Sequence, residues 1–169
     1  MVPNTKEENI ENQKRVNSEI LPFVYKKGNE FEILYDLDLG RNDEFWGFRL
    51  QSGIFLKATC GPGDDVESIT WDNCKAFSES MFLNGKQGQL PSAYLFEKFW
   101  GEEQKAVKAT VKFLKENGIK SKGLLGFIWC LEEDGSLAAY FSFGRGAGGY
   151  FDRNISACYN RLSVFFYPS

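Results

Sequence analysis

The chain of 169 residues contains no histidine. Histidine is the commonest general acid and base near neutral pH, a partner of catalytic serine and cysteine, and a frequent zinc ligand. Its absence excludes histidine-dependent catalysis and histidine-containing metal sites. Any reaction in this chain would have to use carboxylates, lysine, tyrosine or cysteine.

Cysteine is present but lacks the close spacing that metal or redox motifs require. Cys60, Cys74, Cys130 and Cys158 are scattered, and no two of them form a CxxC pair. This spacing excludes a zinc ribbon and a thioredoxin motif. Four free thiols are the simpler interpretation, because a core of this size needs no covalent crosslink, and a disulfide pair stays open as the alternative.

Long apolar runs and an excess of positive charge are also missing. No stretch of about 18 apolar residues predicts a membrane-spanning helix, and the polar first 16 residues have no apolar signal-peptide core. Either the protein is not exported by a signal peptide, or that peptide has been removed. The net charge of −3 and the pI near 5.2 argue against nucleic-acid binding, which requires a dense basic patch.

Aromatic residues are abundant, with 16 Phe, 7 Tyr and 4 Trp in a chain that is 43% hydrophobic. Such side chains suit both a core and a binding surface. The length fits one domain plus a short arm. We predict a polar, flexible arm over residues 1–18 and a single domain over residues 19–169.

Strand patterns lie towards both ends of the chain. They cover residues 31–35, 45–59, 127–131, 137–143 and 162–167. The sequence therefore predicts an α+β domain with a mixed or antiparallel sheet, whose N- and C-terminal strands are adjacent and whose two or three helices lie in the middle.

Three helices are predicted between the strand groups. Thr70 caps the first, which ends near Asn84-Gly85, and Ser92 caps the second, which ends at Trp100-Gly101. The third covers residues 102–116. In the third helix Val107, Val111 and Leu114 form the core stripe, and four lysines are predicted on the opposite face, namely Lys105, Lys108, Lys112 and Lys115. A solvated face is the simpler interpretation of these lysines, and a patch for an acidic partner is the alternative.

Several short motifs occur in a recognisable order. Thr70-Trp71-x-x-Cys74-x-x-Phe77 is followed by Gln89-Leu90-Pro91-Ser92-x-x-x-Phe96, and then by the segments 128–129, 138–144 and 162–164. This order resembles the tryptophan helix, the leucine-proline turn, the second helix and the final strands of C-type-lectin-like domains. The similar branch contains formylglycine-generating enzymes and uncharacterised bacterial and phage surface domains, including adhesin and fimbrial domains.

The resemblance covers residues 45–169 and departs from the family at several positions. Gln89 stands where the usual residue is Arg, Ser163 replaces the terminal Arg, and Ser78 stands where many relatives have their disulfide cysteine. The family's enzymes need a close pair of redox cysteines or histidine ligands, and Cys130 and Cys158 do not have that spacing. The resemblance therefore implies a non-catalytic binding module without a cofactor or metal, and the lack of a long apolar run predicts no membrane insertion.

A glycine-rich stretch, Gly144–Gly149, lacks the Gly-Lys-Ser/Thr of a phosphate-binding loop and is predicted to be a flexible loop between strands. The resemblance places this stretch on the side where ligands bind. The expected ligand residues mix aromatic and adaptable polar side chains. They are Arg145, Tyr150, Asp152, Arg153, Asn154, Tyr159, Asn160 and Arg161.

The first functional hypothesis is recognition of a glycan or protein ligand through these C-terminal loops, on a virion or cell surface or as a secreted protein. The second is a structural subunit of a fimbria or phage particle, in which the same face packs against copies of the chain as a homo-oligomer. The third is an enzyme that uses carboxylate or thiol chemistry. An acidic turn at Asp36, Asp38 and Gly40 lacks the remaining ligands of a calcium loop and is interpreted as a solvated turn.

Overall fold

The computed structural model describes residues 20–57, 69–119, 127–154, 160–161 and 163–166. The predicted arm, Cys60, Cys158 and Tyr159 lie outside the described residues, as do the side chains of Asn160 and Arg161. The described part contains two sheets and two α-helices, which agrees with the predicted α+β class.

The first sheet has seven strands in the order β11-β4-β3-β1-β2-β5-β6. The pairing of β2 with β5 is parallel and the other pairs are antiparallel. Its strands are β1 (Phe23–Lys27), β2 (Glu30–Leu34), β3 (Phe45–Arg49), β4 (Ile54–Lys57), β5 (Phe82–Leu83), β6 (Lys86–Gln87) and β11 (Ser163–Phe165).

The second sheet has four strands in the order β10-β7-β8-β9. Strands β7, β8 and β9 form an antiparallel meander, and β10 pairs with β7 in parallel. Their bounds are β7 (Phe127–Asp134), β8 (Leu137–Ser142), β9 (Ala147–Asp152) and β10 (Asn160–Arg161). Strand β9 therefore forms an edge of this sheet.

The prediction that the first and last strands are adjacent is wrong. Strand β11 pairs with β4, and strands β4 and β3 separate it from β1. Strand β11 ends the order of this sheet, yet all three of its residues are buried, because Gln89 exchanges two backbone hydrogen bonds with Phe165 on the side of β11 away from β4.

Two helices lie between the strand groups, together with a short 3-10 turn, η1 (Leu39–Arg41). The first helix, α2 (Trp71–Ser80), begins at Thr70, whose side chain accepts a hydrogen bond from the backbone N–H of Asn73. The second, α3 (Ala93–Glu116), begins at Ser92, whose side chain accepts from the N–H of Tyr94. Both predicted N-caps are confirmed.

The predicted break between two short helices at Trp100-Gly101 is wrong, because α3 is continuous through this point. A glycine inside a helix costs only about 1 kcal/mol. Phe96, Trp100 and Val107 are all buried along α3, and their packing outweighs that cost.

The predicted end of the first helix at Asn84-Gly85 is also wrong. The helix ends at Ser80, and Asn84 and Gly85 form the two-residue turn between β5 and β6 with φ angles of 50° and 84°. Positive φ at both central residues is what a tight hairpin of this hand requires, and Asn-Gly is its preferred sequence.

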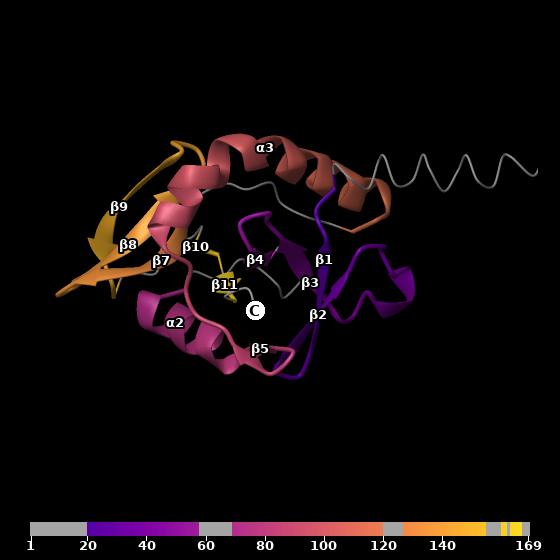
Figure 1. Cartoon of the computed structure of the whole chain (residues 1–169), viewed down its shortest axis with the longest axis horizontal. Helices are drawn as coiled ribbons and strands as arrows, with labels where there is room; N and C mark the ends of the chain where they lie inside the picture. Colours follow the sequence, from indigo (N-terminus) through magenta and orange to yellow (C-terminus); the bar gives the residue numbers. More distant parts are fainter. Residues whose placement is uncertain (1–19, 58–68, 120–126, 155–159, 162, 167–169) are drawn as a thin grey trace, which may run out of the picture.

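The helices cover the sheets from different sides (Figure 1). Helix α3 runs across both sheets, so that Phe96 stacks on Phe141 of β8 and Phe113 stacks on Phe23 of β1. Helix α2 buries Trp71 and Cys74 against the opposite face of the four-stranded sheet. Helix α3 thereby joins the two sheets through one continuous apolar cluster.

One carboxyl group lies inside this interface. Glu103 on α3 is 1% exposed, and its Oε1 accepts a hydrogen bond of 2.7 Å from the backbone N–H of Ser52. Its Oε2 has no hydrogen-bond partner among the described residues. Burial raises the pKa of Glu103, because the charged form loses its hydration.

We expect Glu103→Gln to raise the free energy of unfolding by about 1 kcal/mol at neutral pH. A carboxyl whose pKa rises on folding favours the folded state at low pH, and that contribution is lost as the pH rises through the folded-state pKa. Glutamine keeps an acceptor for Ser52 and carries no charge. Urea unfolding of both proteins should show that the difference between their free energies of unfolding grows as the pH rises from about 4 to about 7. A difference that does not change with pH would contradict the buried-charge interpretation.

Candidate functional site

Five of the residues predicted to bind ligand lie around the edge strand β9. Arg145 lies in the turn before it, Tyr150 and Asp152 lie on it, and Arg153 and Asn154 follow it. Arg145, Tyr150, Asp152 and Asn154 are exposed. The structure thus brings these five residues to one edge of the four-stranded sheet, whereas Asn160 and Arg161 form β10 at the opposite edge, so the prediction of one shared surface is wrong for them.

The prediction of a flexible loop over Gly144–Gly149 is wrong for its second half. Residues 147–152 form β9, which pairs with β8 along its whole length. Gly149 lies opposite Tyr140, and a Cβ built at Gly149 would lie 2.6 Å from the hydroxyl oxygen of that tyrosine. The glycine is therefore required by the Tyr140 ring, which covers it and stacks on Phe151 with ring centroids 4.0 Å apart.

Arg153 is held by three neighbouring elements. Its guanidinium lies 2.7 Å from Asp72 Oδ1 at the start of α2, 2.9 Å from Glu133 Oε1 on β7, and 4.3 Å above the centroid of the Trp71 ring. Its backbone carbonyl accepts from the N–H of Trp71. These contacts fix the end of β9, so the guanidinium orients the strand instead of extending freely into solvent.

The side chains beyond this anchor form a small exposed surface, which we call the β9 face: Tyr150, Asp152 and Asn154. Tyr150 is 52% exposed, and side chains at i and i+2 of a strand point the same way, so Asp152 shares its side of the sheet. Asp152 Oδ1 accepts a hydrogen bond of 2.9 Å from the N–H of Asn154. An aromatic ring and fixed polar groups therefore lie together on a rigid strand.

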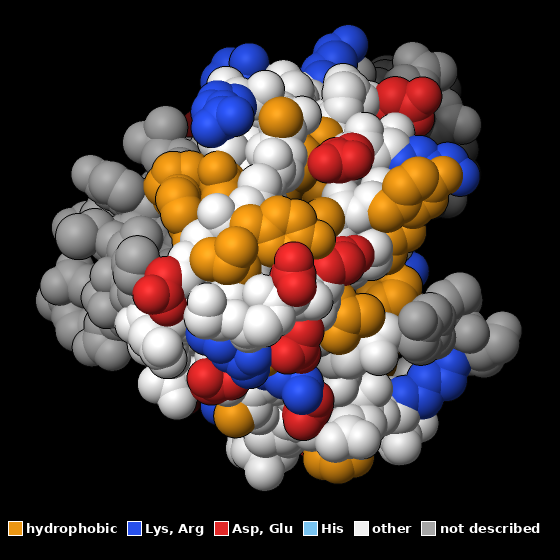
Figure 2. Space-filling model, turned by 90° about the vertical axis from the view of Figure 1, so that its left-hand side faces the viewer, with side chains coloured by type: hydrophobic (Ala, Val, Ile, Leu, Met, Phe, Trp, Pro, Cys, Tyr) orange, Lys and Arg blue, Asp and Glu red, His pale blue; other side chains and the backbone are white. Residues whose placement is uncertain are grey.

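The first turns of α3 lie beside this face. A Cβ built at Gly148 would lie 3.1 Å from Glu97 Oε1, and Tyr94, three residues before Glu97, is 63% exposed. Figure 2 views the molecule from the side where β8 and β9 lie, and shows hydrophobic groups among charged side chains of both signs. This surface is mixed apolar and charged in character.

The two described cysteines are free and buried. Burial raises the pKa of the Cys74 thiol to about 12 and raises the pKa of Cys130 well above its ordinary range. A thiol is nucleophilic only as thiolate, so neither group is activated at neutral pH.

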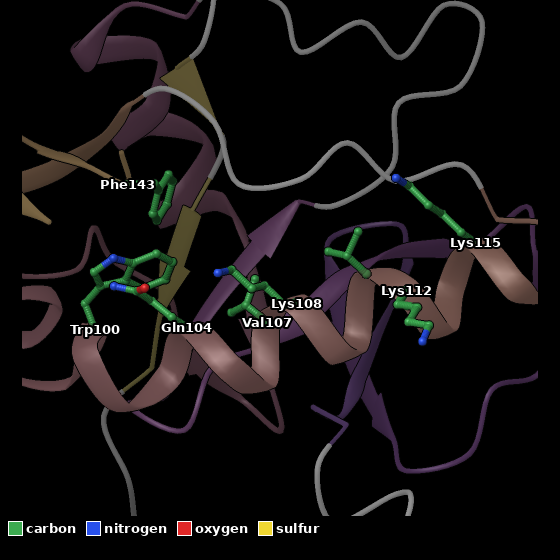
Figure 3. Close-up of a pocket in the computed structure, with 8 residues that line it drawn as sticks. Trp100, Gln104, Val107, Lys108, Lys112, Lys115 and Phe143 are labelled. Atoms are coloured by element: carbon green, nitrogen blue, oxygen red, sulfur yellow. The ribbon is translucent and has the colours of Figure 1, made fainter. Parts of the chain in front are cut away.

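A separate pocket of about 450 Å³ runs along α3, beside its buried apolar strip (Figure 3). Trp100 and Phe143 lie at one end, and the rest of the lining comes from successive turns of the helix. Its lining residues are Trp100, Gln104, Val107, Lys108, Val111, Lys112, Lys115 and Phe143. We call this feature the α3 groove.

The groove corrects the predicted position of the lysines. Lys108, Lys112 and Lys115 line the same pocket as Val107 and Val111, instead of lying opposite them. Side chains at i and i+4 share a helix face, and a lysine stem is long enough to border an apolar strip. Trp100, Gln104 and Phe143 were not predicted as binding residues, because their convergence depends on how β8 packs on α3.

Comparison with protein-family models, with curated proteins and with solved structures found no match to this chain. Within the described ranges, no group of three or more His, Cys, Asp and Glu side chains is placed to hold a metal ion. Neither helix of the described part has the combination of length and apolar character that crossing a bilayer requires.

Proposed function

We propose that the protein is a non-catalytic recognition module of lectin-like type that binds a glycan or protein ligand at the β9 face, on a virion or cell surface. The observation that carries the proposal is the presentation of Tyr150 and Asp152 on a strand anchored by Arg153. A surface that is ordered before binding loses less conformational entropy when the ligand arrives.

The chemistry of the β9 face supports this assignment. A half-exposed tyrosine offers a flat apolar ring for a sugar face or an apolar side chain, while Asp152 and Asn154 supply hydrogen-bond acceptors and donors. Tyrosine with small polar residues is the composition that binding loops of antibodies use.

A second candidate function is assembly with copies of the chain. Strand β9 ends the order of its sheet, so the backbone groups on its outer side have no strand partner among the described residues. An edge of this kind can add a strand from another chain. Light scattering coupled to size exclusion would distinguish the candidates, because assembly predicts a concentration-dependent oligomer and recognition alone predicts a monomer.

We expect Tyr150→Ala to weaken ligand binding about 30-fold, the effect typical of a central aromatic contact. The ligand would first be identified on a glycan array and a panel of host-surface proteins, and its affinity then measured by biolayer interferometry. Tyr35→Ala is the matched control, because Tyr35 is 69% exposed and directly follows β2 of the other sheet.

Asp152→Ala should also weaken binding, and its effect should be additive with Tyr150→Ala only in part, because both side chains would touch one ligand. Equal affinity of the Tyr150→Ala, Asp152→Ala and wild-type proteins would refute the β9 face as the binding site.

A further inference from the structure

We propose that the α3 groove is a second site, independent of the β9 face, which binds an amphiphilic anion: a small molecule with an apolar chain or ring and one carboxylate, sulfate or phosphate group. The lining divides into an apolar part and a cationic part within one pocket of about 450 Å³. This size lies in the ordinary range of small-molecule sites.

The apolar part forms the floor of the groove. Trp100, Phe143, Val107 and Val111 are each less than 10% exposed, and all belong to the cluster that joins α3 to the sheets. Trp100 and Phe143 pack against each other with ring centroids 5.0 Å apart. Their positions are therefore fixed by the core, and the groove exists before any ligand binds. A ligand that covers this floor gains apolar burial without reorganising the protein.

The cationic part forms the rim. Lys108, Lys112 and Lys115 are exposed and follow one another over roughly 10 Å of helix. None of the three forms an ion pair with any residue in the part of the chain that the structure covers. Like charges at this spacing repel one another, and an anion between them relieves the repulsion.

An uncharged polar group lies near the aromatic end of the groove. Gln104 lies one helical turn after Trp100 and also lines the groove. Figure 3 shows Lys108 and Val107 between this end and Lys115. The groove thus offers the amide of Gln104 near its aromatic end and the ammonium groups of Lys108 and Lys115 further along, whereas the Lys112 ammonium points to the other side of the helix from that of Lys115.

The arrangement selects against other ligand classes. A polynucleotide would need a longer basic track and exposed aromatic faces, and a purely apolar ligand would leave the lysines unpaired. The whole chain has a net charge of −3, so this cluster of three lysines is locally opposite in sign to the protein as a whole. An anion with an apolar body satisfies both parts of the lining at once.

Decanoate, below its micelle concentration, is the probe for this site. Isothermal titration calorimetry on the full chain should show one decanoate bound per protein, at least about tenfold tighter than decanol and than acetate. Raising the salt concentration from about 0.05 M to about 0.5 M should lower the affinity for decanoate and leave the affinity for decanol unchanged, because screening acts only on the charged headgroup.

Two variants test the location. Lys108→Gln combined with Lys115→Gln should weaken decanoate about tenfold, while Lys105→Gln, an exposed lysine of the same helix outside the lining, should have no effect. Gln104→Trp should block the groove without entering the core, since Gln104 is only half-buried. Equal binding of decanoate and decanol, an equal loss in Lys105→Gln, or no heat with wild-type protein would overturn the proposal. Tyr150→Ala should bind decanoate normally, so failure here leaves the β9 proposal standing.

Discussion

Replacing Gly88 with alanine is expected to lower the free energy of unfolding by about 3 kcal/mol. Gly88 is buried just after β6, where its N–H donates to the carbonyl of Met81 at 2.8 Å. An added Cβ would overlap Cγ1 of Val164 and would lie 2.6 Å from the backbone carbonyl oxygen of Ser78. Because the carbonyl belongs to α2 and Val164 is a fully buried residue of β11, neither can move without disturbing its element.

Gly101→Ala is the matched control. Gly101 lies in the middle of α3, and no atom lies within 4 Å of a Cβ built there. Alanine has the higher helix propensity, so this variant should gain about 1 kcal/mol. Urea unfolding followed by circular dichroism gives both values. A Gly88→Ala protein as stable as wild type would mean that α2 and β11 do not approach as closely as the structure has them.

Gly101 and the pair Asn84-Gly85 show which features of the fold the sequence could predict and which it could not. The sequence predicted a helix end at Gly101 from local composition, but the continuity of α3 depends on Phe96 and Trp100 reaching Phe141 on a distant strand. Asn84-Gly85 was a correct signal for positive φ. Whether such a pair ends a helix or turns a hairpin was decided by the complete burial of Met81, which ends α2 earlier.

In the candidate sites, too, local features were predictable from the sequence and features that depend on tertiary packing were not. Exposure of Tyr150 and Asp152 was predictable, because both lie in a glycine-rich segment with polar neighbours. Their placement on a strand was not, because it depends on the pairing of Gly149 with Tyr140. The regular spacing of Lys108, Lys112 and Lys115 was visible in the sequence, whereas the groove beside them requires Phe143 to reach α3.

Trp71→Ala is expected to destabilise the protein by about 4 kcal/mol. The side chain is fully buried, and its Nε1 donates to the carbonyl of Cys130 at 2.7 Å. Truncation removes a large apolar contact, leaves that carbonyl without its donor and removes the ring beneath Arg153. The measurement is the denaturant concentration at the midpoint of unfolding, which reports stability when the m-value of the variant equals that of the wild type.

Trp71→Phe separates these contributions. Phenylalanine keeps most of the volume and a ring for Arg153 but cannot donate to Cys130, so its cost should be about 2 kcal/mol. Because Arg153 links this ring to the end of β9 through Asp72 and Glu133, the alanine variant should also expose the β9 amides to faster hydrogen exchange. Faster exchange at β9 in Trp71→Ala, with near-normal exchange in Trp71→Phe, would establish that a tryptophan on α2 holds the β9 face in order. Unchanged exchange in Trp71→Ala would instead mean that the β8 pairing and the ion pairs of Arg153 hold that strand without the Trp71 ring.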